Sequence, residues 1–187
     1  GFLGGHFVNR ALANNHKIYF FKRPGKISRV KINGEVMRIE GELDKISLKN
    51  FRNIDVVVHF ASPGVSPQKA SWNELHYFNV ISLLSLLKEC ANNNIKKIII
   101  AGSYLEYGLS ANLYKYIPTI AALRPTNAYA ASKAAGFDLA HGFCVSNKIP
   151  LIYNRIFSAY GDYQYEKNFW PSLKKASLNG ETFRMTT

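Results

Sequence analysis

Asp55-Val56-Val57-Val58-His59-Phe60 carries the clearest structural signal in this chain. Its β-branched residues form an unbroken apolar run, which is typical of a strand buried on both faces of a parallel sheet. The turn residues Ser62-Pro63-Gly64 follow almost directly and end the strand. We therefore predict a buried strand over residues 55–60, followed by a tight turn.

Strand-like and helix-like segments alternate on both sides of this run. Residues 72–92 carry apolar side chains near the 3.6-residue period of a long helix, and residues 128–146 do the same. Such alternation builds a doubly wound α/β fold, in which helices cover both faces of a parallel sheet. The other predicted elements are a helix at 4–14, strands at 16–21, 36–40, 97–101 and 151–157, and a short helix at 46–52.

Composition narrows the classes of function. The chain has 187 residues, with 24 Lys and Arg against 12 Asp and Glu, but the basic residues are scattered singly, which argues against a nucleic-acid surface. Its longest apolar run, residues 80–87, is far shorter than the roughly 20 residues of a membrane span. The distant cysteines Cys90 and Cys144 lie in apolar helical contexts and are expected to be reduced thiols of a cytoplasmic protein.

The two ends of the chain suggest a segment of a longer protein. It opens on Gly1-Phe2-Leu3-Gly4 without an initiator Met, and it closes on an alternating segment, 184–187, that is typical of a strand cut short. The dispersed histidines lack ligand spacing, so no metal site is proposed.

The strongest chemical motif is Tyr129-Ala130-Ala131-Ser132-Lys133. A spacing of four on a helix puts Tyr129 and Lys133 on one face, where an ammonium lowers the pKa of a nearby phenol from about 10. Such a phenol exchanges a proton with a hydroxyl or carbonyl near neutral pH. The motif therefore predicts a proton relay.

Four landmarks occur in an order that resembles the extended short-chain dehydrogenases/reductases, the NAD-dependent epimerase/dehydratase family of nucleotide-sugar epimerases, dehydratases and ketoreductases. A glycine turn opens a helix, where it favours a pyrophosphate. A strand is then followed by a segment whose serine hydroxyl is expected to lie beside the catalytic tyrosine. The YxxxK motif comes next, and a last strand is followed by Tyr-Gly. The four segments are Gly1-Phe2-Leu3-Gly4, Gly102-Ser103-Tyr104-Leu105-Glu106-Tyr107-Gly108, 127–133 and 155–161.

The resemblance implies roles for individual residues. The catalytic group is Ser103, Tyr129 and Lys133, the last two of which also bind the cofactor. Ser158 stands where many relatives place an Asn, and ordinary packing is an alternative reading for Leu43, 60–62 and Asn79. The further cofactor contacts are Gly1, Phe2, Leu3, Gly4, Lys22, Arg23, Leu43, Phe60, Ala61, Ser62, Asn79, Ile156 and Phe157, and the substrate contacts are Ser103, Ser158, Asn168, Phe169 and Arg184.

The same resemblance implies a domain division and partners. Residues 1–160 are expected to form a cofactor-binding domain that lacks its first strand, and residues 161–187 to begin a nucleotide-sugar-binding lobe. A homodimer packed through helices 72–92 and 128–146 is expected, with a nucleotide sugar as substrate. Neither a nucleic acid nor a membrane is an expected partner.

Cofactor choice separates the possible reactions. NAD-specific relatives place an acidic residue at the end of the second family strand, whereas this chain has Lys22 and Arg23, which suit the 2′-phosphate of NADP. NADP, with NAD as the alternative, favours a 4-ketoreductase of a nucleotide-linked deoxysugar. A 4-epimerase that keeps NAD bound and a catalytically silent NAD(P)-binding protein are the alternatives.

Dehydration is the reaction that the sequence disfavours. The resemblance implies a carboxylate pair directly after the catalytic hydroxyl residue, and this chain has Tyr104 and Leu105 there. Glu106 comes one place later, and in an extended segment it would point to the opposite face. We therefore expect no 4,6-dehydratase activity.

Overall fold

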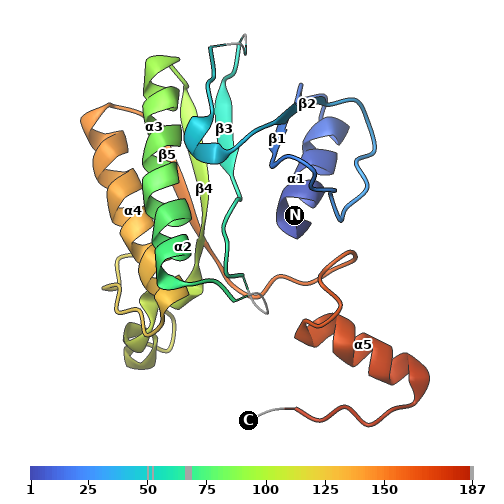
Figure 1. The fold of residues 1–187 in the computed structure, drawn as a ribbon. Coiled ribbons are helices and arrows are strands. Elements are labelled where there is room, and N and C mark those ends of the chain that lie inside the picture. The colour runs from blue at the N-terminus through green and yellow to red at the C-terminus, as the bar shows by residue number, and fades with distance from the viewer. Residues whose placement is uncertain (50, 52, 66–68, 186–187) are drawn as a thin grey trace. The chain divides into compact units, whose positions relative to one another are not determined.

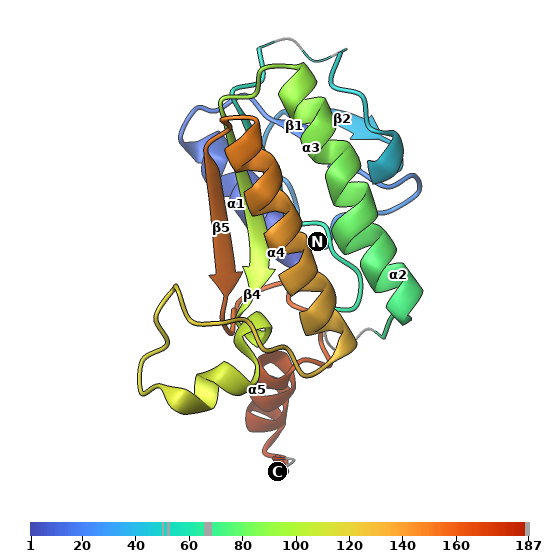
Figure 2. The same ribbon diagram turned by 90° about the vertical axis from the view of Figure 1, so that its left-hand side faces the viewer.

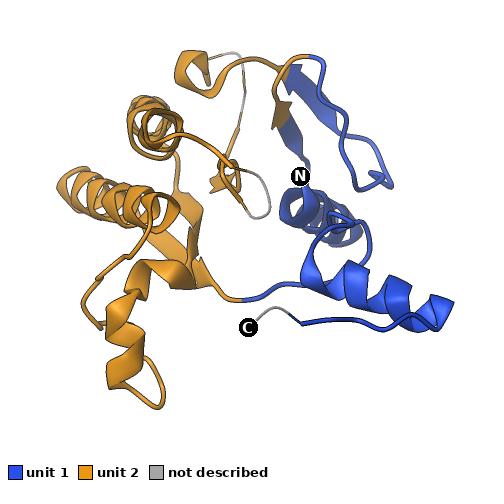
Figure 3. Cartoon of the chain, turned by 60° about the horizontal axis from the view of Figure 1, so that its bottom comes forward, with its two compact units in different colours: residues 1–20, 25–39, 158–187 blue, residues 21–24, 40–157 orange. Residues whose placement is uncertain are grey.

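The structure is a computed structural model that describes residues 1–49, 51, 53–65 and 69–185 (Figure 1). The chain forms two compact units (Figure 3). Unit 1 comprises residues 1–20, 25–39 and 158–187, and unit 2 comprises residues 21–24 and 40–157. The predicted domain boundary at residue 160 stays a prediction.

Unit 2 is built on a parallel three-stranded sheet. Its strands are β3 (Val56–His59), β4 (Lys97–Ser103) and β5 (Leu151–Ile156), in the order β3-β4-β5. Val58 pairs with Ile99, which pairs in turn with Ile152. Because all three strands run the same way, their carboxyl ends meet at one edge of the sheet, and that edge carries the site described below.

Helices cover one face of this sheet. A first helical stretch consists of α2 (Trp72–His76), a single π-helical stretch η2 (Tyr77–Ile81) and α3 (Ser82–Asn92). The second helix, α4 (Ala128–Ser146), begins where the Asn127 side chain accepts a hydrogen bond from the Ala130 N–H at 2.9 Å. Figures 1 and 2 show α3 and α4 side by side against β4 and β5.

The core lies between these helices and the sheet. Ile98 and Ile100 of β4 are almost completely buried against apolar residues of α3 and α4. Burial of each such side chain stabilises the fold by about 1.5–3 kcal/mol. The glycine at position 136 allows α4 to pack closely against η2. A Cβ added at Gly136 would lie only 2.6 Å from the Asn79 carbonyl oxygen. The buried helix residues of this core are Leu83, Leu86, Leu87, Cys90, Ala140 and Cys144.

The segment between β4 and α4 turns away from the sheet as two short 3-10 helices, η3 (Tyr104–Tyr107) and η4 (Leu109–Leu113).

Unit 1 contains α1 (Phe2–Ala13) and α5 (Phe169–Asn179). A two-stranded sheet of β1 (Tyr19–Lys22) and β2 (Met37–Glu40) precedes a third 3-10 helix, η1 (Leu43–Lys45).

Comparison with the sequence predictions confirms the parallel sheet and the Rossmann-like α/β class. The predicted helix at 46–52 is wrong where the structure describes it: residues 46–49 are not helical, because Ile46 and Leu48 pack irregularly on the core, while 50 and 52 lie outside the described residues. The terminal strand predicted at 184–187 is not formed at residues 184–185, and residues 186–187 lie outside the described part. The helix α5 was not predicted.

Within the described part of the chain, no helix combines the length and the apolar character that crossing a membrane requires.

Candidate active site

Ser103 ends β4 at the carboxyl edge of the sheet and caps the next turn. Its Oγ accepts a hydrogen bond from the Leu105 N–H at 3.3 Å, and its own N–H donates to Glu106 Oε1 at 2.7 Å. This reciprocal pattern is a capping box, and it starts η3 directly after the strand. The result is a fixed hydroxyl at the edge where the three strands end.

Tyr129 and Lys133 lie on α4, as their spacing predicted. Lys133 is only 5% exposed, and its Nζ donates to the carbonyl oxygen of Ala101 in β4 at 2.6 Å. Burial lowers the pKa of this ammonium to about 8, an effect that the nearby Glu106 carboxylate opposes. Lys133 therefore loses its proton close to physiological pH.

The Tyr129 phenol meets two hydroxyl groups. Burial raises the pKa of the Tyr129 phenol, and the neighbouring Ser62 and Ser103 hydroxyl groups oppose that shift without cancelling it. The expectation that Lys133 lowers this pKa is wrong for the chain alone, because the Lys133 ammonium donates to the Ala101 carbonyl and burial dominates. Tyr129 is thus a protonated phenol near neutral pH.

A chain of hydrogen bonds connects Ser62 to the backbone of Tyr129. The Ser62 hydroxyl donates to Asn79 Oδ1 at 2.8 Å, and Asn79 Nδ2 donates to the Ser132 hydroxyl at 2.9 Å. Ser132 donates in turn to the Tyr129 carbonyl oxygen at 2.8 Å. The π-helical stretch carries Asn79, which is 3% exposed, and such stretches frequently mark functional sites. Ser62 and Asn79 therefore join the group around Tyr129.

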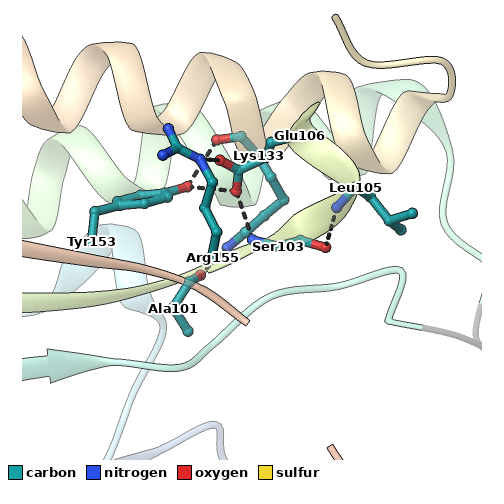
Figure 4. A network of polar contacts seen from close by, with 7 residues as sticks. All are labelled: Ala101, Ser103, Leu105, Glu106, Lys133, Tyr153 and Arg155. Carbon is teal, nitrogen blue, oxygen red and sulfur yellow. Dashed lines mark hydrogen bonds and ion pairs between the residues drawn. The ribbon is translucent and has the colours of Figure 1, made fainter. Parts of the chain in front are cut away.

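Sequence reasoning missed a buried carboxylate beside this group. Glu106 is completely buried, and its Oε2 accepts from Arg155 Nε of β5 at 2.8 Å (Figure 4). The Tyr153 hydroxyl lies 3.1 Å from Glu106 Oε1 and 3.0 Å from the Lys133 carbonyl oxygen. The prediction of an extended segment after Ser103 was wrong, because η3 turns Glu106 back toward the strand end. The spacing Ser103-x-x-Glu106, a capping-box signature, is the signal that would have found it.

The other predicted residues of unit 2 lie on several elements. Lys22 forms a salt bridge of 2.5 Å with Glu40, and Arg23 is exposed. Phe157 stacks on Tyr104 with ring centroids 5.2 Å apart, just beyond β5 and β4. Leu43 belongs to η1, Phe60 and Ala61 follow β3, and Ile156 ends β5.

The remaining predicted contacts belong to unit 1, which we describe by itself. Gly1 precedes α1 as its N-cap residue, and Phe2 to Gly4 form the first turn. Asn168 stands at the N-terminus of α5 and Phe169 opens that helix. Ser158 and Arg184 are exposed. Their roles stay predictions.

A Ser, a Tyr and a Lys at the carboxyl edge of a Rossmann-like sheet are the arrangement expected of a short-chain dehydrogenase/reductase domain. Comparison with protein families agrees: the model of the NAD dependent epimerase/dehydratase family matches residues 1–186. The chain therefore belongs to this family of enzymes.

Curated relatives include two kinds of sugar-nucleotide protein. The dTDP-D-glucose 4,6-dehydratase of Dictyostelium discoideum is 27% identical over 97% of this chain and 47% of its own length. An uncharacterised UDP-glucose epimerase of Bacillus subtilis is 30% identical over 59% of this chain and 35% of its own length. The chain thus spans about half, or less, of the length of these relatives.

A solved structure similar to this chain is UDP-N-acetylglucosamine 4-epimerase from Methanobrevibacter ruminantium M1 in complex with UDP-N-acetylmuramic acid. It is 27% identical, with a TM-score of 0.84 over 97% of this chain and 61% of that one. Another, in complex with UDP-glucuronic acid and NAD, is 27% identical, with a TM-score of 0.79 over 97% of this chain and 60% of that one.

Proposed function

We propose that the protein moves a hydride between a nicotinamide cofactor and C4 of a nucleotide-linked hexose, and that it is a 4-epimerase. The observation that carries the proposal is the cluster of Ser103, Tyr129 and Lys133, in which two hydroxyl groups and a buried ammonium gather at the strand ends. A likeness of 27% identity to a UDP-N-acetylglucosamine 4-epimerase supports the reaction class. The proposal concerns the full-length protein, since this chain spans only part of the length of its relatives.

The residues present fit a nicotinamide cofactor. The Lys133 ammonium and the Tyr129 and Ser62 hydroxyl groups are the kinds of donor that bind the hydroxyl groups of a ribose. They lie at the carboxyl edge of the sheet, where dinucleotides bind in Rossmann-like folds. The cofactor, when bound, supplies the hydride acceptor and donor.

In this proposal the Tyr129 phenol exchanges a proton with the C4 oxygen of the sugar, while the Ser103 hydroxyl hydrogen-bonds that oxygen. Oxidation at C4 needs Tyr129 as the phenolate that accepts the hydroxyl proton, and reduction of the resulting ketone needs it as the phenol that returns the proton to the developing alkoxide; burial favours the phenol form. The neighbouring Ser62 and Ser103 hydroxyl groups lower the pKa of Tyr129 against the effect of burial and so favour the phenolate form. The capping of Ser103 by its own turn keeps its hydroxyl in place throughout.

The second candidate is a 4-ketoreductase of a nucleotide-linked deoxysugar that uses NADPH. The exposed cation Arg23 favours it, because a guanidinium binds a 2′-phosphate well. Lys22, however, already forms a salt bridge with Glu40, which removes part of the positive charge at this strand end. The epimerase with NAD is therefore the first candidate.

Two measurements on the full-length protein test these candidates. Incubation with UDP-N-acetylglucosamine and catalytic NAD, followed by NMR of the sugar, is expected to show the 4-epimer, and Tyr129→Phe serves as the inactive control. Titration with NADH and NADPH is expected to show tighter NADH binding. Tighter NADPH binding that is lost in a Lys22→Asp, Arg23→Asn double variant would instead support the ketoreductase.

We also propose that the protein is a homodimer packed through the helical stretch 72–92, which comprises α2, η2 and α3, and through α4. Large apolar side chains are exposed on these helices, and they would be covered in such a dimer. Light scattering on the full-length protein is expected to give twice the mass of one chain, and a monomer at micromolar concentration would contradict the proposal. The exposed residues are Trp72, Tyr77, Ile81 and Val145.

A further inference from the structure

Glu106 is a completely buried carboxylate that forms hydrogen bonds in addition to its ion pair (Figure 4). Its Oε2 pairs with Arg155, a guanidinium that also lies 4.2 Å from the centre of the Phe137 ring. Its Oε1 accepts from the Ser103 N–H at 2.7 Å and lies 3.1 Å from the Tyr153 hydroxyl. One side chain of η3 thus contacts both β4 and β5.

These contacts lead to both ends of the catalytic cluster. The Ser103 N–H belongs to the residue whose hydroxyl bonds Tyr129. The Tyr153 hydroxyl, 3.0 Å from the Lys133 carbonyl oxygen, connects the same carboxylate to the backbone of α4 at Lys133. Glu106 therefore contacts Ser103 directly and Lys133 through the Tyr153 hydroxyl, and it is completely buried.

We propose that Glu106 is a positioning residue, which fixes Ser103 against α4 through the Ser103 N–H and the Tyr153 hydroxyl and places its negative charge near the Lys133 side chain. The proposal rests on the proposed function for its effect on turnover, but not for its effect on Lys133. It also assigns Arg155 a supporting part, because the guanidinium compensates the buried carboxylate and leaves Oε1 to act on Ser103 and Tyr153.

The direction of the charge effect follows from the surroundings of Lys133. Burial lowers the pKa of Lys133, and the Glu106 carboxylate is the charge that raises it again. Removal of that charge therefore moves the ionisation of Lys133 to lower pH. Among the described residues, His59 of β3 and Glu106 of η3 act electrostatically on Lys133, while Tyr153 and Arg155 of β5 contact Glu106.

Glu106→Gln tests the proposal, because it keeps the shape of the side chain and removes its charge. In the full-length protein we expect kcat at pH 7.5 to fall on the order of tenfold with little change in KM, since a displaced Ser103 and a neutral Lys133 slow the chemical step. We also expect the ionisation midpoint of Lys133 to fall below its wild-type value. Carbon-13 NMR of lysine-labelled protein measures that midpoint, with Lys133→Arg to assign the signal.

A double variant separates positioning from mere stability. Glu106→Gln alone leaves the Arg155 charge buried and unpaired, which lowers Tm, whereas Glu106→Gln, Arg155→Met removes both charges and is expected to regain Tm. Under the proposal the double variant keeps the low kcat and the low Lys133 midpoint. If kcat and the midpoint return to wild-type values together with Tm, Glu106 is a structural partner of Arg155 and the proposal is overturned.

Two further variants complete the test. Glu89→Gln is the matched control, because Glu89 accepts from the Leu48 N–H at 2.9 Å away from this cluster, and kcat and the midpoint should stay unchanged. If neither Glu106 variant folds, Tyr153→Phe removes only the bridging hydroxyl and is expected to lower kcat roughly threefold; an unchanged kcat overturns the proposal. A wild-type protein that turns over no nucleotide sugar refutes the proposed function, yet the Lys133 midpoint still decides this inference.

Discussion

Gly102→Ala should destabilise unit 2 strongly, because the strand end has no room for a methyl group. Gly102 is the residue before Ser103 in β4, and it is buried. A Cβ there would overlap Tyr153 Cε1 and would lie 2.6 Å from Glu106 Oε1. Tyr153 and Glu106 are held by hydrogen bonds and an ion pair, so neither moves without breaking them.

The expected cost lies at the upper end of the range for overpacked cores, about 3 kcal/mol in the free energy of unfolding. In a chain of this size that corresponds to a fall in Tm of about 6–12 °C. Urea unfolding followed by circular dichroism measures it, with parallel slopes expected for variant and wild type. Activity should fall as well, because the overlap displaces the turn that carries Ser103.

Gly142→Ala is the matched control for this experiment. Gly142 lies inside α4, and a Cβ added there would meet no atom within 4 Å. The same chemical change should therefore stabilise the protein by about 0.5–1 kcal/mol through helix propensity. A loss below about 1 kcal/mol for Gly102→Ala, or equal effects of the two substitutions, would refute the packing argument.

Three further predictions concern the cluster itself. Tyr129→Phe should remove more than nine tenths of turnover and leave NAD affinity within about threefold of wild type, as measured by steady-state kinetics and calorimetry. Burial lowers the folded-state pKa of Lys133 to about 8. The buried ammonium therefore lowers the free energy of unfolding by its full amount below pH 8, and this destabilisation disappears as pH rises toward about 10.5, the pKa of an unfolded lysine. The free energy of unfolding of wild type relative to Lys133→Met should therefore rise by about 3 kcal/mol over that window in urea titrations. Finally, mass spectrometry should find no 4-keto-6-deoxy product from dTDP-glucose; its formation would contradict our interpretation of residues 104–106.

Local signals explain why much of the fold could be predicted. The helix predicted at 128–146 has the bounds of α4, since Asn127 is a strong N-cap and the helix stays regular to its end. The helix predicted at 72–92 also forms, but its π-helical stretch was not visible in the sequence. That stretch follows from tertiary packing, in which Gly136 lets α4 approach the Asn79 carbonyl closely. Periodicity reports local geometry and not such contacts.

The candidate site likewise contains features that local spacing predicts and features that only the tertiary fold creates. Tyr129 and Lys133 share a helix, so their spacing alone placed them on one face. The salt bridge between Glu106 and Arg155 joins residues 49 positions apart, and the pairing of β4 with β5 creates it. A single sequence carries no signal for that pairing of side chains. The ionisation of Lys133 was equally out of reach, because burial sets it.

The position of Glu106 also bears on the difference between this chain and the dehydratases to which it is similar. Dehydration needs a carboxylate that is free to take and return a proton beside the sugar. Here the acidic residue of the 104–107 turn binds Arg155 and the Ser103 N–H from the far side of the strand end, and it is completely buried. The residue directly after Ser103 is Tyr104, which is partly exposed and whose ring stacks on Phe157. Tyr104 and Leu105 supply no carboxylate, and the one carboxylate of this turn is held in an ion pair, so we expect the turn to lack the acid and base that dehydration needs.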